Sequence, residues 1–271
     1  MAKKIMLGNE AIARGAYEAG VKVSAAYPGT PSTEISENIV QYKEIYSEWS
    51  PNEKVAAEVA IGAAISGVRA MFSMKHVGVN VASDPLYTIS YGGVNGGLVL
   101  VAADDPGLYS SQNEQDTRMV GRAAQVPVLE PSDSQEAKDF VKLAFELSEQ
   151  YDTPMIVRTT TRLAHSQGLV ELCDREEVAD KPYERNVAKF VMMPGMAKQR
   201  HIYVEQRLKK MAEDACSLSI NKAEYNDTSI GFITSGIPYQ YPIDGSPPGS
   251  PFPGILQART LEWVAISFSN A

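Results

Sequence analysis

The chain has 271 residues, of which 44% are hydrophobic, and a formal net charge of −8. This length allows one large α/β domain or somewhat more, and the acidic balance argues against nucleic acid as a partner. No apolar stretch reaches the length of a membrane span and the N-terminus is too polar for a signal peptide, so we expect a cytoplasmic protein without membrane contact. Cys173 and Cys216 lie far apart with no CxxC spacing, so we expect no metal ligands and no iron–sulfur cluster held by this chain alone.

The first predicted elements are a helix and a strand separated by a glycine. Helical apolar spacing runs from Gly8 to Ala19 and stops at Gly20, a residue typical of helix ends. Residues 21–27 then predict a buried strand that leads into Pro28-Gly29-Thr30-Pro31. Because proline suits the first position of a helix, we expect the next helix to begin at Pro31, with Thr30 as its N-cap.

The next candidate helix begins near Glu53, in the stretch NEKVAAEVAIGAA. Ser50 stands where an N-cap belongs, Pro51 would be the first helical residue and Glu53 the third. This pattern is a capping box, in which Glu53 would bond back to the Ser50 amide and have a purely structural role.

Four further strands are predicted from short apolar runs between turn residues: 69–74, 97–104, 126–130 and 154–161. Helical segments lie between them, most clearly at residues 134–150. This alternation predicts an α/β fold with a parallel sheet and helices on both faces. Since ligands bind at the carboxyl ends of such strands, the loops after Tyr27, Met74, Asp104 and Thr161 are the expected site.

The composition changes twice towards the C-terminus. We expect residues 1–175 to form the main domain, 176–226 a charged linker with a helix, and 227–241 the first strand of a truncated second α/β domain. Basic residues should form the solvent-exposed face of the linker helix: Lys198, Arg200, Arg207, Lys209 and Lys210. Residues 242–271 begin with a run rich in proline and glycine, so we expect an unrelated tail without regular structure.

Several motifs together resemble one family. Tyr27-Pro28-Gly29-Thr30-Pro31-Ser32 is similar to the YPxTPS loop of 2-oxoacid:ferredoxin oxidoreductases, and Glu53 with Ala56, Ala57 and Gly62 resembles the pyrimidine-domain helix of thiamine diphosphate enzymes. The strings MKHVGVNVASDPL, SSQNEQDTR and TTRLAHSQ resemble the alpha subunit of indolepyruvate:ferredoxin oxidoreductase. The resemblance covers about Lys4 to Tyr241.

This resemblance implies a pyrimidine-binding domain of an enzyme that decarboxylates an aryl 2-oxoacid such as indolepyruvate to its acyl-CoA and passes electrons to ferredoxin. A diphosphate-binding domain and a beta subunit would be the partners, coenzyme A and ferredoxin would act on the complete enzyme, and Mg²⁺ and [4Fe–4S] clusters would be held outside this chain. The chain alone is then expected to be inactive. Two alternatives stay open: a truncated, non-catalytic fragment that only associates with partners, and the equivalent domain of a pyruvate or 2-oxoglutarate enzyme.

The resemblance also implies roles for single residues. Glu53 would be the catalytic carboxylate that bonds to N1′ of the pyrimidine, with Tyr27, Pro28 and Thr30 also contacting the cofactor. Thr30, His76 and Arg118 would contact the substrate. Each has a structural alternative: Thr30 as an N-cap, His76 as an ordinary buried histidine, and Arg118 as the ion-pair partner of Asp116 or Glu114.

Overall fold

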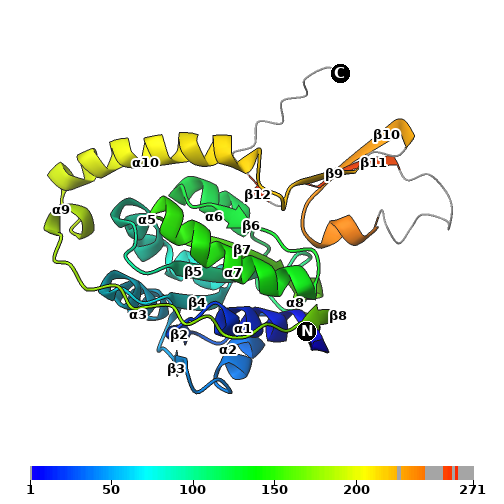
Figure 1. Ribbon diagram of the computed structural model, residues 1–271, viewed down its shortest axis with the longest axis horizontal. Helices are drawn as coiled ribbons and strands as arrows, with labels where there is room; N and C mark the ends of the chain where they lie inside the picture. The colour runs from blue at the N-terminus through cyan, green and yellow to red at the C-terminus, as the bar shows by residue number, and fades with distance from the viewer. Residues whose placement is uncertain (1, 225–226, 242–252, 258–259, 262–271) are drawn as a thin grey trace.

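The computed structural model describes residues 2–224, 227–241, 253–257 and 260–261, and a seven-stranded sheet lies at its centre (Figure 1). The sheet order is β12-β6-β7-β5-β4-β2-β3, and neighbouring strands are parallel except for β12 beside β6. Its strands are β2 (Val23–Ala26), β3 (Tyr46–Trp49), β4 (Ala70–Lys75), β5 (Leu98–Asp104), β6 (Val128–Leu129), β7 (Met155–Thr160) and β12 (Thr260–Leu261).

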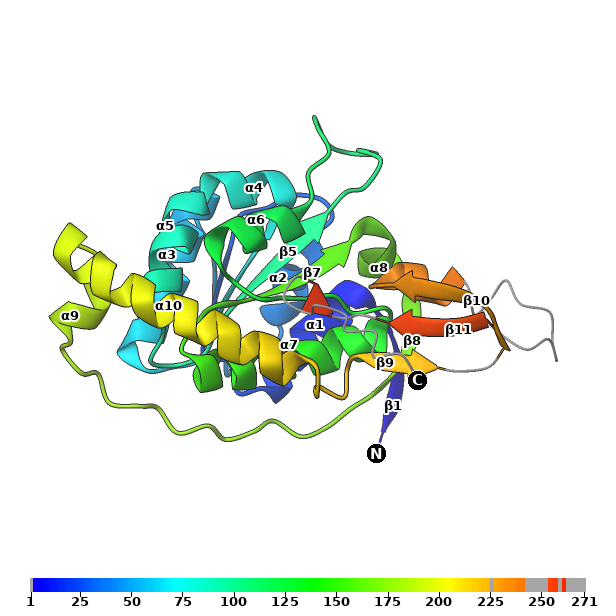
Figure 2. The same ribbon diagram turned by 90° about the horizontal axis from the view of Figure 1, so that it is seen from above.

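Helices cover both faces of this sheet (Figure 2). One face carries α1 (Gly8–Glu18), α2 (Thr33–Ile39) and α7 (Ser134–Tyr151). The other carries α3 (Glu53–Ser66), α4 (His76–Val81), α5 (Ser83–Gly92) and α6 (Thr117–Ala124). The predicted parallel sheet with helices on both faces is therefore confirmed.

The side chains of β5 show why its sequence reads as one continuous apolar run. Val99 and Val101 point into the core beneath α1, α2 and α7, whereas Leu98 and Leu100 point into the core beneath α3 to α6. Because successive side chains of a strand alternate between faces, a strand covered on both sides needs apolar residues at every position.

Smaller elements surround this core. An antiparallel ribbon pairs β1 (Lys3–Leu7) with β8 (Gln167–Glu171), and α8 (Thr161–His165) precedes β8. The chain then passes through α9 (Val187–Phe190) into α10 (Pro194–Ala215). A three-stranded sheet follows, in the order β10-β11-β9, from β9 (Lys222–Glu224), β10 (Asp227–Thr234) and β11 (Pro253–Gln257), with a 3₁₀ turn at Ile237–Tyr239.

Strands β11 and β12 lie within residues 242–271, for which the sequence predicted no regular structure. The structure differs from that prediction at these two strands: β11 pairs with β10 and β9, and β12 pairs with β6. Pro253 is compatible with a strand because it is the first residue of β11, where proline is tolerated. The rest of this segment, residues 242–252, 258–259 and 262–271, lies outside the described residues.

Helix α10 corrects the expectation of a solvent-exposed basic face. Arg207 is only 5% exposed and donates to the main-chain oxygens of Asp152 (2.7 Å) and Ser90 (2.9 Å), so it fastens α10 to the ends of α5 and α7. Arg200 donates to the Tyr91 oxygen at 2.6 Å. Burial lowers the pKa of Arg207 to about 10. Lys209, by contrast, is exposed, as predicted.

We expect Arg207→Met to lower the free energy of unfolding by about 2–3 kcal/mol, because the two carbonyls lose charged donors inside the packed interface. Lys209→Met is the matched control on the exposed side of the same helix and should change that free energy by less than about 0.5 kcal/mol. Urea unfolding of the two variants measures the difference, and equal effects would show that α10 is not fastened through Arg207.

Candidate active site

The candidate site lies along the edge of the sheet where the parallel strands end. The chain leaves β2 for β3 on one side and returns to β4 on the other, so the order reverses between β2 and β4. In open α/β sheets this reversal leaves a crevice at the carboxyl ends of the strands, where ligands bind. The loops after β2, β3, β4, β5 and β7 all meet this edge.

The loop after β2 contains Tyr27, Pro28 and Thr30, all of them exposed. Its turn is closed by Ser32, whose amide and hydroxyl both donate to the Gly29 oxygen at 2.7 Å. Helix α2 begins only at Thr33, and the Thr30–Pro31 peptide bond is cis. The prediction of Thr30 as the N-cap of a helix starting at Pro31 is therefore wrong, and the Thr30 side chain lies free of capping at the sheet edge.

Glu53 is the first residue of α3, not the third. Asn52 is the N-cap, and its side chain accepts a hydrogen bond from the Val55 amide at 3.0 Å. Ser50 instead continues from β3, since its amide donates to the Ala26 oxygen at 2.8 Å. The predicted capping box does not form, so the structural role proposed for Glu53 from the sequence is wrong.

The Glu53 carboxyl group packs against α4. A Cβ atom placed on Gly78 would lie 2.6 Å from Glu53 Cγ and 2.7 Å from its Oε1, so only glycine leaves room for this side chain. Glu53 is half-buried, and none of the described residues forms a hydrogen bond or ion pair with its carboxylate. The carboxylate is not among the buried atoms that lack a partner, so it reaches solvent and is available to a ligand.

Lys75 is the last residue of β4 and His76 the first of α4, and both lie beneath the loop that joins β5 to α6. Lys75 Nζ donates to the Ser110 oxygen at 2.7 Å, and His76 Nε2 lies 3.0 Å from the Asn113 oxygen. His76 is only 1% exposed, and its Nδ1 is buried without a partner in the described part of the chain. The structure thus places His76 under this loop, and a direct contact with substrate requires the loop to move.

Asp105 fixes the start of the same loop. Its carboxylate accepts from the Ser110 amide (2.8 Å), the Ser111 hydroxyl (2.6 Å) and the Thr161 hydroxyl (2.8 Å). Burial acts to raise the pKa of Asp105, but these hydrogen bonds and the charge of Lys75 outweigh it and lower the pKa to about 2.

A lowered pKa makes a stabilising contribution that is complete above the unfolded value of 3.8 and is lost as the pH falls towards about 2. Between these pH values the melting temperature of the native chain should therefore fall about 2–4 °C further than that of Asp105→Asn. Thermal melts at pH 4 and pH 2 measure this difference, and parallel losses in the two proteins would contradict the assignment.

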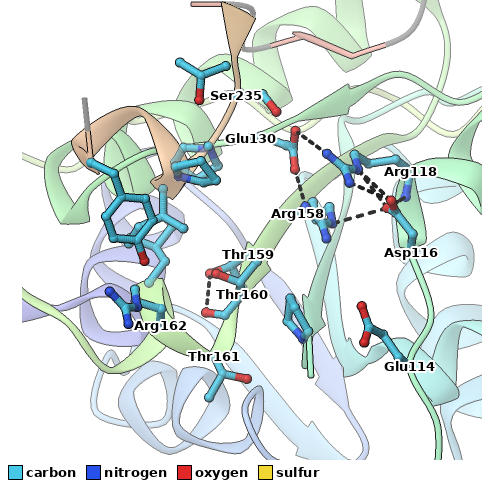
Figure 3. Close-up of a pocket in the computed structure, with 18 of the residues that line it drawn as sticks. Glu114, Asp116, Arg118, Glu130, Arg158, Thr159, Thr160, Thr161, Arg162 and Ser235 are labelled. Carbon is cyan, nitrogen blue, oxygen red and sulfur yellow. Dashed lines mark hydrogen bonds and ion pairs between the residues drawn. The ribbon is translucent and has the colours of Figure 1, made fainter. Parts of the chain in front are cut away.

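A pocket of about 890 Å³ opens at the β7 end of this edge (Figure 3). Its walls come from the loop after β5, the start of α6, residues 158–163 and residues 233–241. Arg118 lies in the pocket, but its guanidinium already forms hydrogen bonds with Asp116 (2.6–2.9 Å) and an ion pair with Glu130 (3.5 Å). The ion-pair alternative with Asp116 is thus observed, while Glu114 bonds to the Gly107 amide instead.

Arg158 is the functional candidate that sequence reasoning missed. It lies on β7, is 8% exposed, and contacts Asp104, Asp116 and Glu130. The signal in the sequence was an arginine inside the apolar run MIVRTT, where a buried charge requires partners. Those partners come from three other segments, and the sequence alone does not bring them together.

The structure therefore brings the predicted residues to one edge in two groups. Tyr27, Pro28 and Thr30 lie by the reversal point, where Gly29 packs against Lys75, and Glu53 lies against α4. Arg118 belongs to the pocket beside β7. The loop from Asp105 to Asp116 joins the two groups, since it bonds to Lys75 and His76 and also lines the pocket.

Comparison with protein families matches residues 14–229 to the family described as "Pyruvate flavodoxin/ferredoxin oxidoreductase, thiamine diP-bdg". The chain belongs to this thiamine diphosphate-binding family. Glu53 fits the cofactor, because its unpartnered carboxylate is available for the pyrimidine ring. Among the described residues, no group of three or more histidine, cysteine or acidic side chains is placed to hold a metal ion.

Curated relatives of two kinds match this chain. Indolepyruvate oxidoreductase subunit IorA of Archaeoglobus fulgidus is 48% identical over 248 residues, covering 88% of this chain and 40% of that protein. The subunit of the same name from Pyrococcus horikoshii is 45% identical, covering 88% and 38%. 2-Oxoglutarate synthase subunit KorA of Methanothermobacter thermautotrophicus is 31% identical, covering 63% and 48%. The chain thus spans about two fifths of the length of the IorA relatives.

A solved structure shares the fold. The 2-oxoglutarate:ferredoxin oxidoreductase from Magnetococcus marinus superimposes with a TM-score of 0.78 over 96% of this chain and 54% of that chain, at 16% sequence identity. None of the described helices is both long and apolar enough to cross a membrane.

Proposed function

We propose that this chain supplies the pyrimidine-binding domain of a cytoplasmic, thiamine diphosphate-dependent enzyme that oxidatively decarboxylates indolepyruvate or a related aryl 2-oxoacid to its acyl-CoA, with ferredoxin as electron acceptor. The observation that carries the proposal is the Glu53 carboxylate, held against Gly78 at the carboxyl edge of the sheet without a hydrogen-bond or ion-pair partner among the residues that the structure describes. Identities of 48% and 45% to IorA subunits support the aryl substrate.

Thiamine diphosphate, when bound, supplies a thiazolium carbon that acts as the nucleophile towards a 2-oxoacid. The task of Glu53 is to hold a proton at N1′ of the pyrimidine, which would favour the imino form of the neighbouring amino group, the form that can accept a proton. Its position at the first turn of α3 keeps the carboxyl group at the mouth of the crevice. Tyr27 and Pro28, exposed beside the reversal point, are available to pack on the ring.

Thr30 and Arg118 are the proposed substrate contacts, one from each group of site residues, and Arg118 is the one assigned to the substrate carboxylate. Thr30 offers a hydroxyl that is not used for capping, and Arg118 offers a planar fork that suits a carboxylate. His76 lies under the loop between Asp105 and Asp116 and holds this loop through its contact with the Asn113 oxygen. These roles require Arg118 to give up part of its bonding to Asp116.

We assign the remaining parts of the enzyme to other domains and subunits. We propose that a diphosphate-binding domain and a beta subunit complete the site, that Mg²⁺ and [4Fe–4S] clusters are held there, and that coenzyme A and ferredoxin act on the complete enzyme. The two cysteines described in the chain, Cys173 and Cys216, are both free thiols.

The test is a complex assembled from this chain and the subunits that supply the missing domains. Coenzyme A-dependent reduction of ferredoxin should require thiamine diphosphate, and kcat/KM for indolepyruvate should exceed that for pyruvate or 2-oxoglutarate by at least about 10-fold. A preference for either small 2-oxoacid would contradict the aryl assignment. Turnover without thiamine diphosphate would contradict the proposed function itself.

A further inference from the structure

Arg118 and Arg158 share their acidic partners. Arg118 is held by Asp116, the N-cap of α6, and by Glu130, which follows β6. The same two carboxylates face Arg158: Glu130 accepts a hydrogen bond from its Nη1, and Asp116 Oδ1 lies 3.7 Å from its Nε (Figure 3). Each carboxylate is therefore within reach of both guanidinium groups.

Asp104 is the partner that keeps Arg158 in place. This carboxylate is fully buried at the end of β5, accepts from Arg158 Nε at 2.6 Å and from the Thr117 amide at 3.0 Å, and also bonds to the Thr117 hydroxyl. Three donors hold it, so neither Asp104 nor Arg158 is free to move independently. Asp116 is more exposed, at 33% of its side chain, and within the described part of the chain its hydrogen bonds come from Arg118.

A substrate carboxylate at Arg118 would enter a cluster that already carries more negative than positive charge. Three carboxylates, Asp104, Asp116 and Glu130, already face the two guanidinium groups. A further carboxylate at Arg118 would place four negative charges on two positive ones. Binding is more favourable if Asp116 finds another cation as it leaves Arg118.

We propose that Arg158 is a positioning residue that takes over Asp116 when Arg118 turns to the carboxylate of the 2-oxoacid. The inference rests on the proposed function, in which Arg118 binds that carboxylate. The movement is small, because Asp116 Oδ1 already lies 3.7 Å from Arg158 Nε; the N–H of Nε is donated to Asp104, so the new charged hydrogen bond would come from an Nη group. Arg158 has five N–H donors, and its hydrogen bonds within the described part of the chain leave some of them for Asp116.

The test compares Arg158→Lys, Asp116→Asn and the double variant in the assembled complex. Lysine keeps the charge but loses the fork, so KM for indolepyruvate should rise by about 10- to 100-fold while kcat changes by less than about 3-fold. Asparagine still caps α6 but no longer competes for Arg118, so Asp116→Asn alone should lower KM. In the Asp116→Asn background, Arg158→Lys should change KM by less than about 2-fold, because Asp116 no longer has a charge for Arg158 to take over.

A purely structural Arg158 gives a different pattern. The effects of Arg158→Lys and Asp116→Asn on KM would then be independent, and KM would rise equally in both backgrounds, which overturns the inference. Asp116→Asn provides a second route that does not depend on the folding of the Arg158 variant: a higher KM in that protein also overturns it. Arg118→Gln tests the proposed function separately from the exchange. An unchanged KM in this variant would refute the proposed carboxylate site and not merely the role of Arg158.

Discussion

Glu53→Gln should lower kcat of the assembled complex by about 10² to 10⁴, the range that general acid–base groups contribute, while the fold survives. Glutamine has nearly the shape of glutamate and can occupy the space beside Gly78, but it cannot hold a proton at N1′. The measurement is single-turnover decarboxylation of indolepyruvate at saturating thiamine diphosphate. Thermal melting of the same protein reports the fold.

The stability of this variant should change little. Glu53 lies in the first turn of α3, where a negative charge is worth about 0.3–1 kcal/mol, and it makes no capping bond that glutamine would lose. Asn52→Ala is the matched control one residue earlier: it removes the side chain that accepts from Val55 and should cost about 1 kcal/mol without loss of turnover. Full activity of Glu53→Gln would refute the cofactor role of this residue.

The central strands could be predicted because a strand that is buried on both faces needs apolar residues at nearly every position. β4, β5 and β7 are covered on both faces, so they read as continuous apolar runs bounded by turn residues. β3 was missed because it is the edge strand of the sheet, and its sequence YSEW alternates polar and aromatic residues that remain partly exposed. The ribbon of β1 and β8 was missed for the same reason.

Helix starts were harder, because several nearby residues are chemically able to cap. Ser50 fits the N-cap pattern by sequence, but its amide is already bonded to Ala26 as an extension of the strand, so the helix begins later, at Asn52. Thr30 fails as a cap because it lies inside the turn closed by Gly29 and Ser32, and Ser32 is the residue before α2. In both cases local propensity ranks the possible cap residues equally, and a contact with the preceding chain decides which residue begins the helix.

The sequence predicted only part of the candidate site. The sequence placed Thr30 in the loop after a strand, where the structure has it, whereas Glu53 and Arg118 were named from the resemblance. The pairing of Arg158 with Asp104 and Glu130 joins residues 54 and 28 positions apart, and no local pattern encodes such separations. The packing of Glu53 against Gly78 is of the same kind, since it depends on how closely α3 approaches α4.

Gly78→Ala should reduce kcat/KM of the complex by about 10², without unfolding the chain. The added methyl would lie 2.6–2.9 Å from the Cγ, Cδ and Oε1 atoms of Glu53, which is closer than non-bonded atoms approach. The flexible glutamate side chain can turn away at little cost to stability, but its carboxyl group then leaves its place at the edge of the sheet. A misplacement of about 1 Å is enough to cost about 10²-fold in rate.

Gly62→Ala is the matched control, since it adds the same methyl group to α3, where nothing lies within 4 Å. This variant should retain full activity and gain about 0.5–1 kcal/mol of stability, as expected when alanine replaces glycine within a helix. Thiamine diphosphate titration and kcat/KM of the two variants test the contrast. In a Glu53→Gln background, Gly78→Ala should add little further loss, because the group it displaces no longer holds a proton. Equal activity of Gly78→Ala and Gly62→Ala would show that the position of Glu53 against α4 has no part in catalysis.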